Sequence, residues 1–453
     1  MADHRLQATA RGVVQPPRTL SWQQCSWLMF TDIVGSGVLT FAGVARQLGW
    51  VLTISFMICL CPIAIYTSTL MSRARNEVVR HIHVKPLTMG ECARYTLGGD
   101  RAANATYFFV YLIFGGCGNA SYLLALGTAC QGIFYEYEIC LSKALLMSCL
   151  FLLPLVTWLR HLGETARICF LNLFLIIAVL AICCIKLVLS GRSPSVQTFA
   201  VGEAANFFTI WMAITNMFFA FTGHWIFFEL MGEMKQPETF PKVFIVNGPL
   251  QVTLYLFVAV IGYYYTGDQA KGFLLDNLPV GRMYQVASLL LALHVAIAYI
   301  LKNIVVARFL HGRFSPLRVG SSSLQARLEF AICSFGLLLT SFFLTNSIPW
   351  FDDFTAITGS LLGAPVALLL PLAFFLSARR LHHATSSHLL DAANDGHCTG
   401  PCKLSVFDNF MFVVIVLLAF GIMIIGTLNA IQNTIDRSDE KASFLTCKNE
   451  NNY

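Results

Sequence analysis

Charged residues are scarce in this sequence. Only 12% of its 453 residues are Asp, Glu, Lys or Arg, whereas 56% are hydrophobic, and a soluble domain carries roughly 25% charged residues. This composition argues against a soluble globular protein and indicates a membrane protein. The net charge of +6 is modest, and no run of basic residues suits a nucleic acid. We therefore expect the lipid bilayer, and no nucleic acid, as a partner.

Several other signals are missing. Residues 1–20 lack the apolar core of a signal peptide, and no nucleophile–base set supports a membrane enzyme. The segment from Cys398 to Cys402 lies near four histidines, but its spacing fits no standard zinc pattern. A loop without metal is therefore the favoured interpretation, and we expect no metal site, no cofactor and no enzymatic activity. The four histidines are His382, His383, His388 and His397.

Long apolar segments dominate the chain instead. A transmembrane helix needs about 20 mostly apolar residues, and we predict eleven spans. They lie near residues 23–47, 49–72, 105–133, 141–159, 166–189, 206–231, 243–266, 282–307, 327–346, 352–377 and 407–431. The sequence thus predicts an all-α membrane protein, with a transmembrane domain at 23–431 between tails at 1–22 and 432–453.

Lys and Arg are unevenly distributed among the predicted loops. They gather after the second, fourth, eighth and tenth spans, whereas Glu136, Glu138, Asp352 and Asp353 mark the loops between. Short cytoplasmic loops are enriched in Lys and Arg, so we predict a cytoplasmic N-terminus and an exterior or luminal C-terminus. Asn104 begins a glycosylation sequon that this orientation places inside the cell. The sequence does not distinguish between the plasma membrane and a vacuolar or other endomembrane as the protein's location.

Two spans contain polar interruptions. The first span holds Gly-Ser-Gly at 35–37, and the sixth holds Thr-Gly-His at 222–224. One such element commonly reflects close helix packing, but interruptions at corresponding places in two halves indicate a transporter site near the midplane. We predict inverted repeats of five spans at about 23–190 and 206–377. Helices one and six are discontinuous in this prediction, and the helix at 407–431 is an eleventh helix that belongs to neither repeat.

The two interruptions together predict a site for a zwitterion. N–H groups at the start of a half-helix carry partial positive charge and suit a carboxylate, while glycines permit its close approach. Carbonyl groups freed in the sixth span suit an ammonium. A free α-amino acid carries both groups and is the expected substrate. The predicted binding residues are Gly35, Ser36, Gly37, Val38, Asn119, Tyr122, Phe221, Thr222 and Gly223.

Four segments resemble a known family. They are IVGSGVLTFAGVARQLGW at 33–50, FAFTGHWIFFELMGEMKQPETFPK at 219–242, LALHVAIAY at 291–299 and DDFTAITGSLLGAPVALLLPLAFFL at 352–376. In order and motif they resemble the amino acid/auxin permease family. The resemblance implies an eleven-span permease with the leucine-transporter type of fold, which moves amino acids with protons or sodium. It leaves the substrate open.

Four ionisable side chains inside spans are candidates for ion coupling, since intramembrane charge is by default a functional hypothesis. Asp32 departs from the family pattern and either binds a coupling ion or pairs with a neighbour such as Lys302. Lys302 either takes the place of a sodium ion or extends to the cytoplasmic surface, which its position favours. His224 is either a proton carrier or a hydrogen-bonded filler of the break. Glu229 is either a gating or coupling group or one that reaches water.

The function predicted from these features is secondary active transport of amino acids by alternating access. Proton-coupled symport is preferred, and sodium coupling is the alternative. A transporter-like amino acid sensor also remains possible, because binding and transport share one site. The sequence leaves the oligomeric state and the direction of transport open.

Overall fold

The computed structural model describes residues 18, 20–160, 165–203, 205–390 and 404–440. Its regular structure in these ranges is helical, as predicted, and an isolated β-bridge joins Leu20 to Met234. The α-helices are α2 (Trp22–Ile33), α3 (Phe41–Ile82), α4 (Met89–Ala93), α5 (Gly99–Tyr107), α6 (Gly115–Ile133), α7 (Leu141–Trp158), α8 (Thr165–Ser190), α9 (Phe207–Phe219), α10 (Phe227–Glu233), α11 (Phe240–Thr266), α12 (Arg282–Phe314), α13 (Leu324–Ser347), α14 (Phe351–Ile357), α15 (Leu370–Leu390), α16 (Val406–Phe420) and α17 (Thr427–Glu440). The 3₁₀ and π segments are η1 (Ser36–Thr40), η2 (Arg94–Gly98), η3 (Phe108–Phe114), η4 (Tyr135–Tyr137), η5 (His224–Ile226), η6 (Pro237–Thr239), η7 (Gly267–Gln269), η8 (Leu274–Asn277), η9 (Thr358–Gly363), η10 (Pro365–Leu369) and η11 (Gly421–Gly426).

Ten helical segments in the described residues are long and apolar enough to cross a membrane. The sequence predicts eleven, and the difference arises at Ser36–Ile82, a segment of 47 residues. A straight helix of that length would extend roughly 70 Å, more than twice the ~30 Å of hydrocarbon in a bilayer. Gly49 interrupts it with a φ of 75° and a ψ of −177°. The spans predicted at 23–47 and 49–72 lie on either side of this residue.

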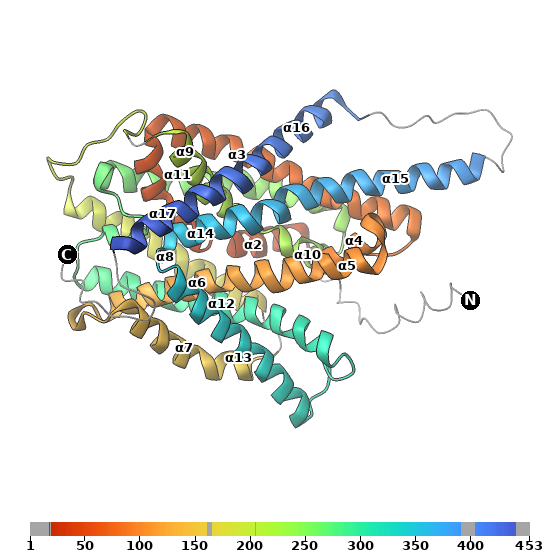
Figure 1. Cartoon of the computed structure of the whole chain (residues 1–453), viewed down its shortest axis with the longest axis horizontal. Helices are drawn as coiled ribbons and strands as arrows, with labels where there is room; N and C mark the ends of the chain where they lie inside the picture. Colours follow the sequence, from red (N-terminus) through yellow and green to blue (C-terminus); the bar gives the residue numbers. More distant parts are fainter. Residues whose placement is uncertain (1–17, 19, 161–164, 204, 391–403, 441–453) are drawn as a thin grey trace.

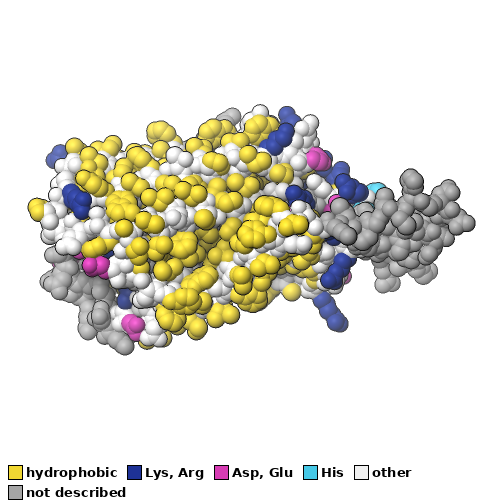
Figure 2. All heavy atoms as spheres, turned by 90° about the horizontal axis from the view of Figure 1, so that it is seen from above, with side chains coloured by type: hydrophobic (Ala, Val, Ile, Leu, Met, Phe, Trp, Pro, Cys, Tyr) yellow, Lys and Arg dark blue, Asp and Glu magenta, His cyan; other side chains and the backbone are white. Residues whose placement is uncertain are grey.

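The helices form an elongated bundle whose long axis many of them follow (Figure 1). Apolar side chains cover the middle of the face seen in Figure 2, and Lys and Arg lie toward its two ends. Large apolar side chains such as Phe151 and Phe174, which are 55% and 72% exposed, point outward. An apolar belt between polar ends is what a bilayer requires. The chain is therefore a multi-pass membrane protein, as predicted.

Two of the basic loops contact each other at one end of the bundle. Arg160, just after α7, donates hydrogen bonds to the carbonyl oxygens of Ser321 and Val319 at 3.2 and 3.5 Å. Both acceptors lie in the loop between α12 and α13. The contact agrees with the prediction that these two loops share one side of the membrane. Which side is cytoplasmic remains a prediction.

The C-terminal helix continues beyond its predicted end. The predicted tail begins at residue 432, but α17 extends to Glu440. Arg437 accounts for the extension, because its guanidinium lies 2.9 Å from Asp353, 3.1 Å from Asp352 and 5.0 Å from the centre of the Trp350 ring. These contacts attach the end of α17 to the start of α14.

The predicted Cys–His segment lies outside the described residues. Cys398, Cys402 and His397 fall in the range 391–403, and the side chains of the other three histidines are likewise not described. Among the side chains that are described, no three of His, Cys, Asp or Glu gather closely enough to hold a metal ion.

Candidate functional site

A small cavity lies where the two interrupted spans meet. In the first span α2 ends at Ile33 and η1 begins at Ser36; in the sixth, α9 ends at Phe219 and η5 begins at His224. The interruptions at 34–35 and 220–223 overlap the predicted ones at 35–37 and 222–224 but begin one and two residues earlier. The cavity has a volume of about 40 Å³, which is room for roughly three waters. The lining residues are Asp32, Ile33, Gly35, Ser36, Gly37, Phe114, Gly115, Gly118, Tyr122, Phe219, Ala220, Thr222, Trp225 and Lys302.

The glycines of the first interruption allow other helices to approach its backbone. A Cβ atom on Gly35 would lie 2.8 Å from the Tyr122 hydroxyl of α6. A Cβ atom on Gly37 would lie 2.8 Å from both Cα and Cβ of Ala220, just after α9. Close packing and cavity lining therefore coincide here, and either glycine would lose the present spacing if it carried a side chain.

Asp32 and Lys302 form an ion pair at the cavity. The ammonium of Lys302 lies 3.4 Å from a carboxylate oxygen of Asp32 and donates a hydrogen bond of 3.0 Å to the Tyr122 hydroxyl. The same ammonium lies 4.7 Å from the centre of the Tyr122 ring and 5.9 Å from that of Trp225. The expectation that Lys302 extends to the membrane surface is therefore wrong, because the carboxylate and the aromatic faces hold it inside the bundle.

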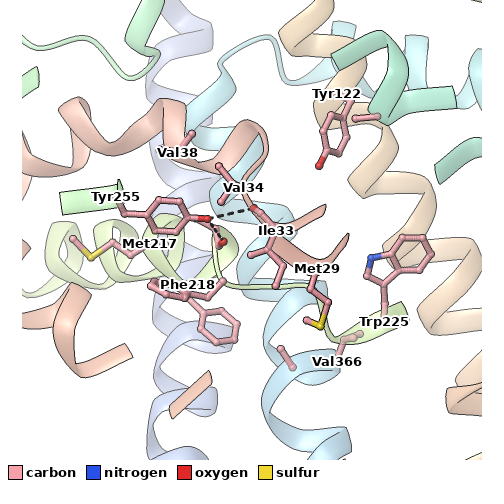
Figure 3. Close-up of a cluster of buried hydrophobic side chains, with 14 of the residues drawn as sticks. Met29, Ile33, Val34, Val38, Tyr122, Met217, Phe218, Trp225, Tyr255 and Val366 are labelled. Carbon is pink, nitrogen blue, oxygen red and sulfur yellow. Dashed lines mark hydrogen bonds between the residues drawn. The ribbon is translucent and has the colours of Figure 1, made fainter. Parts of the chain in front are cut away.

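Tyr255 of α11 connects the two interruptions and is not among the residues predicted from the sequence. Its hydroxyl lies 2.8 Å from the Ala220 carbonyl oxygen and 3.3 Å from that of Ile33. Gln251, one turn earlier, donates a hydrogen bond of 2.8 Å to this hydroxyl. Figure 3 shows Tyr255 reaching the first interruption from one side, with Tyr122 and Trp225 on the other. A tyrosine within an apolar span needs a polar partner, and this was the only available signal.

Several lining residues carry no local sequence signal. Trp225 directly follows the predicted break at 222–224 and supplies an aromatic wall. Phe114 and Gly118, from η3 and α6, belong to an apolar, small-residue stretch that is also typical of close packing. Only the packing of these segments against α12 and η1 brings them to the cavity.

Two of the candidate ion-coupling residues lie away from the cavity lining. Nε2 of the His224 ring lies 2.9 Å from the Thr67 hydroxyl of α3, and the ring packs 4.6 Å from that of Phe227. Glu229 accepts a hydrogen bond from the Tyr111 hydroxyl. His224 thus matches the alternative of a hydrogen-bonded residue that fills the break. The bonded carboxylate oxygen of Glu229 contacts Tyr111 rather than water.

Four of the predicted binding residues lie behind the cavity wall. Phe221 packs edge-on against Tyr255, with 5.4 Å between ring centres, and Val38 is fully buried. A Cβ atom on Gly223 would lie 2.7 Å from the Ile33 side chain, so this glycine serves helix packing. Asn119 is 2% exposed and follows the lining residue Gly118 without itself lining the cavity. The other five predicted binding residues line it.

Known proteins resemble this chain along much of its length. It is 25% identical over 235 residues to the N amino acid transport system protein of Neurospora crassa, covering 50% of this chain and 45% of that protein. It is 23% identical over 374 residues to amino acid transporter AVT1D of Arabidopsis thaliana, covering 80% and 64%. Amino acid permease 4 of the same plant is 19% identical over 392 residues, covering 78% and 84%. The first two matches thus cover less than two thirds of the relatives' length.

The family itself is identified by a match over most of the chain. The family described as transmembrane amino acid transporter protein matches residues 18–394, which include both interrupted spans and the whole cavity lining. Its members are transporters and not enzymes. The chain therefore belongs to the transmembrane amino acid transporter protein family.

Proposed function

We propose that this protein is a secondary active transporter of free amino acids, driven by protons. The observation that carries the proposal is the cavity between two interrupted helices, which is lined by the glycine-rich backbone and by the Asp32–Lys302 pair. Family membership and relatives named as amino acid transporters support the substrate class.

The first interruption suits the substrate carboxylate. Ser36 and Gly37 open a helical segment, where backbone N–H groups have no partner within the helix, and both residues line the cavity. The α-ammonium of the substrate would face the carboxylate of Asp32 and the polar group of Thr222. An amino acid placed in this way has its carboxylate bound by backbone N–H groups of the first interrupted span. Its ammonium contacts Asp32 of the same span and Thr222 of the sixth.

The Lys302 ammonium favours protons over sodium as the coupling ion. It lies next to the Asp32 carboxylate and the Tyr122 hydroxyl, two oxygen groups of the kind that bind hard cations. A resident cation satisfies them without metal. Protonation of Asp32 would release Lys302 from the ion pair, so proton uptake would alter the contacts between α2 and α12. We propose this exchange as the coupling step.

Alternating access would follow from the two halves of the chain. The interruptions lie in the first helix of each predicted repeat, at 23–190 and 206–377, which is the arrangement expected when one repeat moves against the other around a fixed site. The N-terminus is proposed to be cytoplasmic, in a plasma membrane or an endomembrane. Asn104 in α5 tests the orientation: a glycan on this residue in a eukaryotic membrane would contradict it.

Uptake of radiolabelled amino acids into proteoliposomes tests the function. An inward proton gradient in sodium-free buffer is expected to drive accumulation above equilibrium, and a proton ionophore is expected to abolish it. Accumulation that needs sodium and ignores the proton gradient would instead support sodium coupling. Saturable binding without accumulation under either gradient would support an amino acid sensor.

A further inference from the structure

We infer that the transported substrates are small neutral amino acids and that Gly118 of α6 limits the size of their side chain. The inference rests on the proposed function and concerns the same cavity. Three observations carry it: the charge balance of the cavity, its size, and the open space beside Gly118.

While the Asp32–Lys302 pair is intact, the cavity offers no unpaired charge for a charged substrate side chain. Among the described residues that line it, Asp32 and Lys302 are the charged ones, and they pair with each other at 3.4 Å. A zwitterionic amino acid with an uncharged side chain leaves this balance intact. An added acidic or basic side chain would enter a low-dielectric space without a partner, which is costly.

The size of the cavity suits a short side chain. Room for roughly three waters corresponds to about 90 Å³ of liquid volume, and an amino acid must fit its carboxylate and ammonium into the same space. Phe114, Phe219 and Trp225 form bulky walls. On the side of the first interruption, Gly37 is held in place because the backbone of Ala220 lies against it.

Gly118 differs from the neighbouring glycines of α6. A Cβ atom on Gly115, which also lines the cavity, would meet the Val306 side chain at 3.0 Å. A Cβ atom on Gly118 would meet no described atom within 4 Å outside its own helix backbone and chain neighbours. A methyl group on Gly118 would therefore take up cavity space without displacing the protein. Gly116 has equally open surroundings but does not line the cavity, which makes it a matched control.

The test compares wild-type protein with Gly118→Ala and Gly116→Ala in proteoliposomes under a proton gradient. Initial uptake rates are measured for glycine, alanine, leucine, arginine and glutamate. We expect the wild type to favour glycine and alanine over the other three by about ten-fold or more in kcat/KM, since one methylene changes discrimination by about 10- to 200-fold. Gly118→Ala is expected to lower kcat/KM for alanine at least about ten-fold more than for glycine.

The control variant Gly116→Ala is expected to keep the wild-type ratio of alanine to glycine. An equal loss for both substrates in Gly118→Ala, with unchanged thermal stability, would overturn the role of Gly118. Wild-type uptake of leucine, arginine or glutamate as efficient as that of alanine would overturn the substrate class. If no amino acid accumulates under any gradient, the proposed function fails. The size inference is then tested by melting temperature. Alanine, but not leucine, should raise the melting temperature of the wild type, and alanine should not raise that of Gly118→Ala.

Discussion

Replacing Tyr255 with Phe removes one hydroxyl group and leaves the ring. The ring lies 4.8 Å from that of Phe41 and 5.4 Å from that of Phe221, so aromatic packing is expected to hold its position. The lost hydroxyl serves the Ala220 carbonyl at 2.8 Å and the Ile33 carbonyl at 3.3 Å. The variant therefore tests whether this hydroxyl fixes the spacing of the two interruptions.

The expected loss of stability in Tyr255→Phe depends on the hydrogen bonds that the two carbonyl groups keep. The Ile33 carbonyl still accepts the N–H of Gly35 at 2.8 Å, and the Ala220 carbonyl still has the amide of Gln251 at 3.4 Å. Neither group is left without a partner, so the loss lies at the lower end for a buried hydrogen-bonding group, about 1–2 kcal/mol. If that energy holds the binding geometry, affinity for substrate should fall about 5- to 30-fold.

The assay measures substrate affinity and the melting temperature of purified Tyr255→Phe protein. Tyr264→Phe is the matched control, because Tyr264 lies on the same helix but is 47% exposed. We expect Tyr255→Phe to melt at a lower temperature than the control and to bind substrate more weakly. Affinity and melting temperature equal to those of the control would refute the role assigned to this hydroxyl.

Three further changes test the contacts around the cavity and at the end of α17. Gly37→Ala places a Cβ atom 2.8 Å from the backbone after α9 and is expected to abolish substrate binding in a thermal-shift assay; binding of wild-type strength would contradict the packing argument. Asp32→Asn and Lys302→Met should each lower the free energy of unfolding by roughly 1–3 kcal/mol, and the double variant should recover part of this loss in a double-mutant cycle; additive losses would mean that the pair is not coupled. Arg437→Met leaves the fully buried Asp353 without its guanidinium and should lower the melting temperature, whereas an unchanged value would show that Arg437 does not hold α17.

Local sequence features predicted the class of protein and the place of both interruptions. Apolar length identifies a membrane span without knowledge of its neighbours, because the bilayer sets the requirement for each span separately. The interruption at 35–37 and the end of α9 at Phe219 follow from small and polar residues within such spans. The predicted helix end at 431 is too early, because Arg437 pairs with Asp352 of α14, which lies far away in the sequence.

The sequence also named Lys302 as a partner for Asp32 but could not choose between Lys302 and a coupling ion. A coupling ion and Lys302 were both compatible with a lone carboxylate inside a span, and Lys302 itself lay close enough to a helix end to favour a surface position. The distance of 3.4 Å between the two groups is decided by tertiary packing, in which α2 and α12 both pack against α8 and α12 also packs against α6. The local sequence around either residue does not indicate how these helices pack.

By itself, then, the sequence determined what each segment must do in a bilayer: which stretches span it, where two of them break, and which family the motifs resemble. Only the tertiary structure decided which side chains meet at the breaks. Tyr255 belongs to an apolar span and Gly118 to a small-residue stretch, and neither differs in its surroundings from residues that only pack. Their roles arise because hydrophobic burial is non-directional, whereas a hydrogen bond or an open cavity wall requires a particular arrangement of helices far apart in the chain.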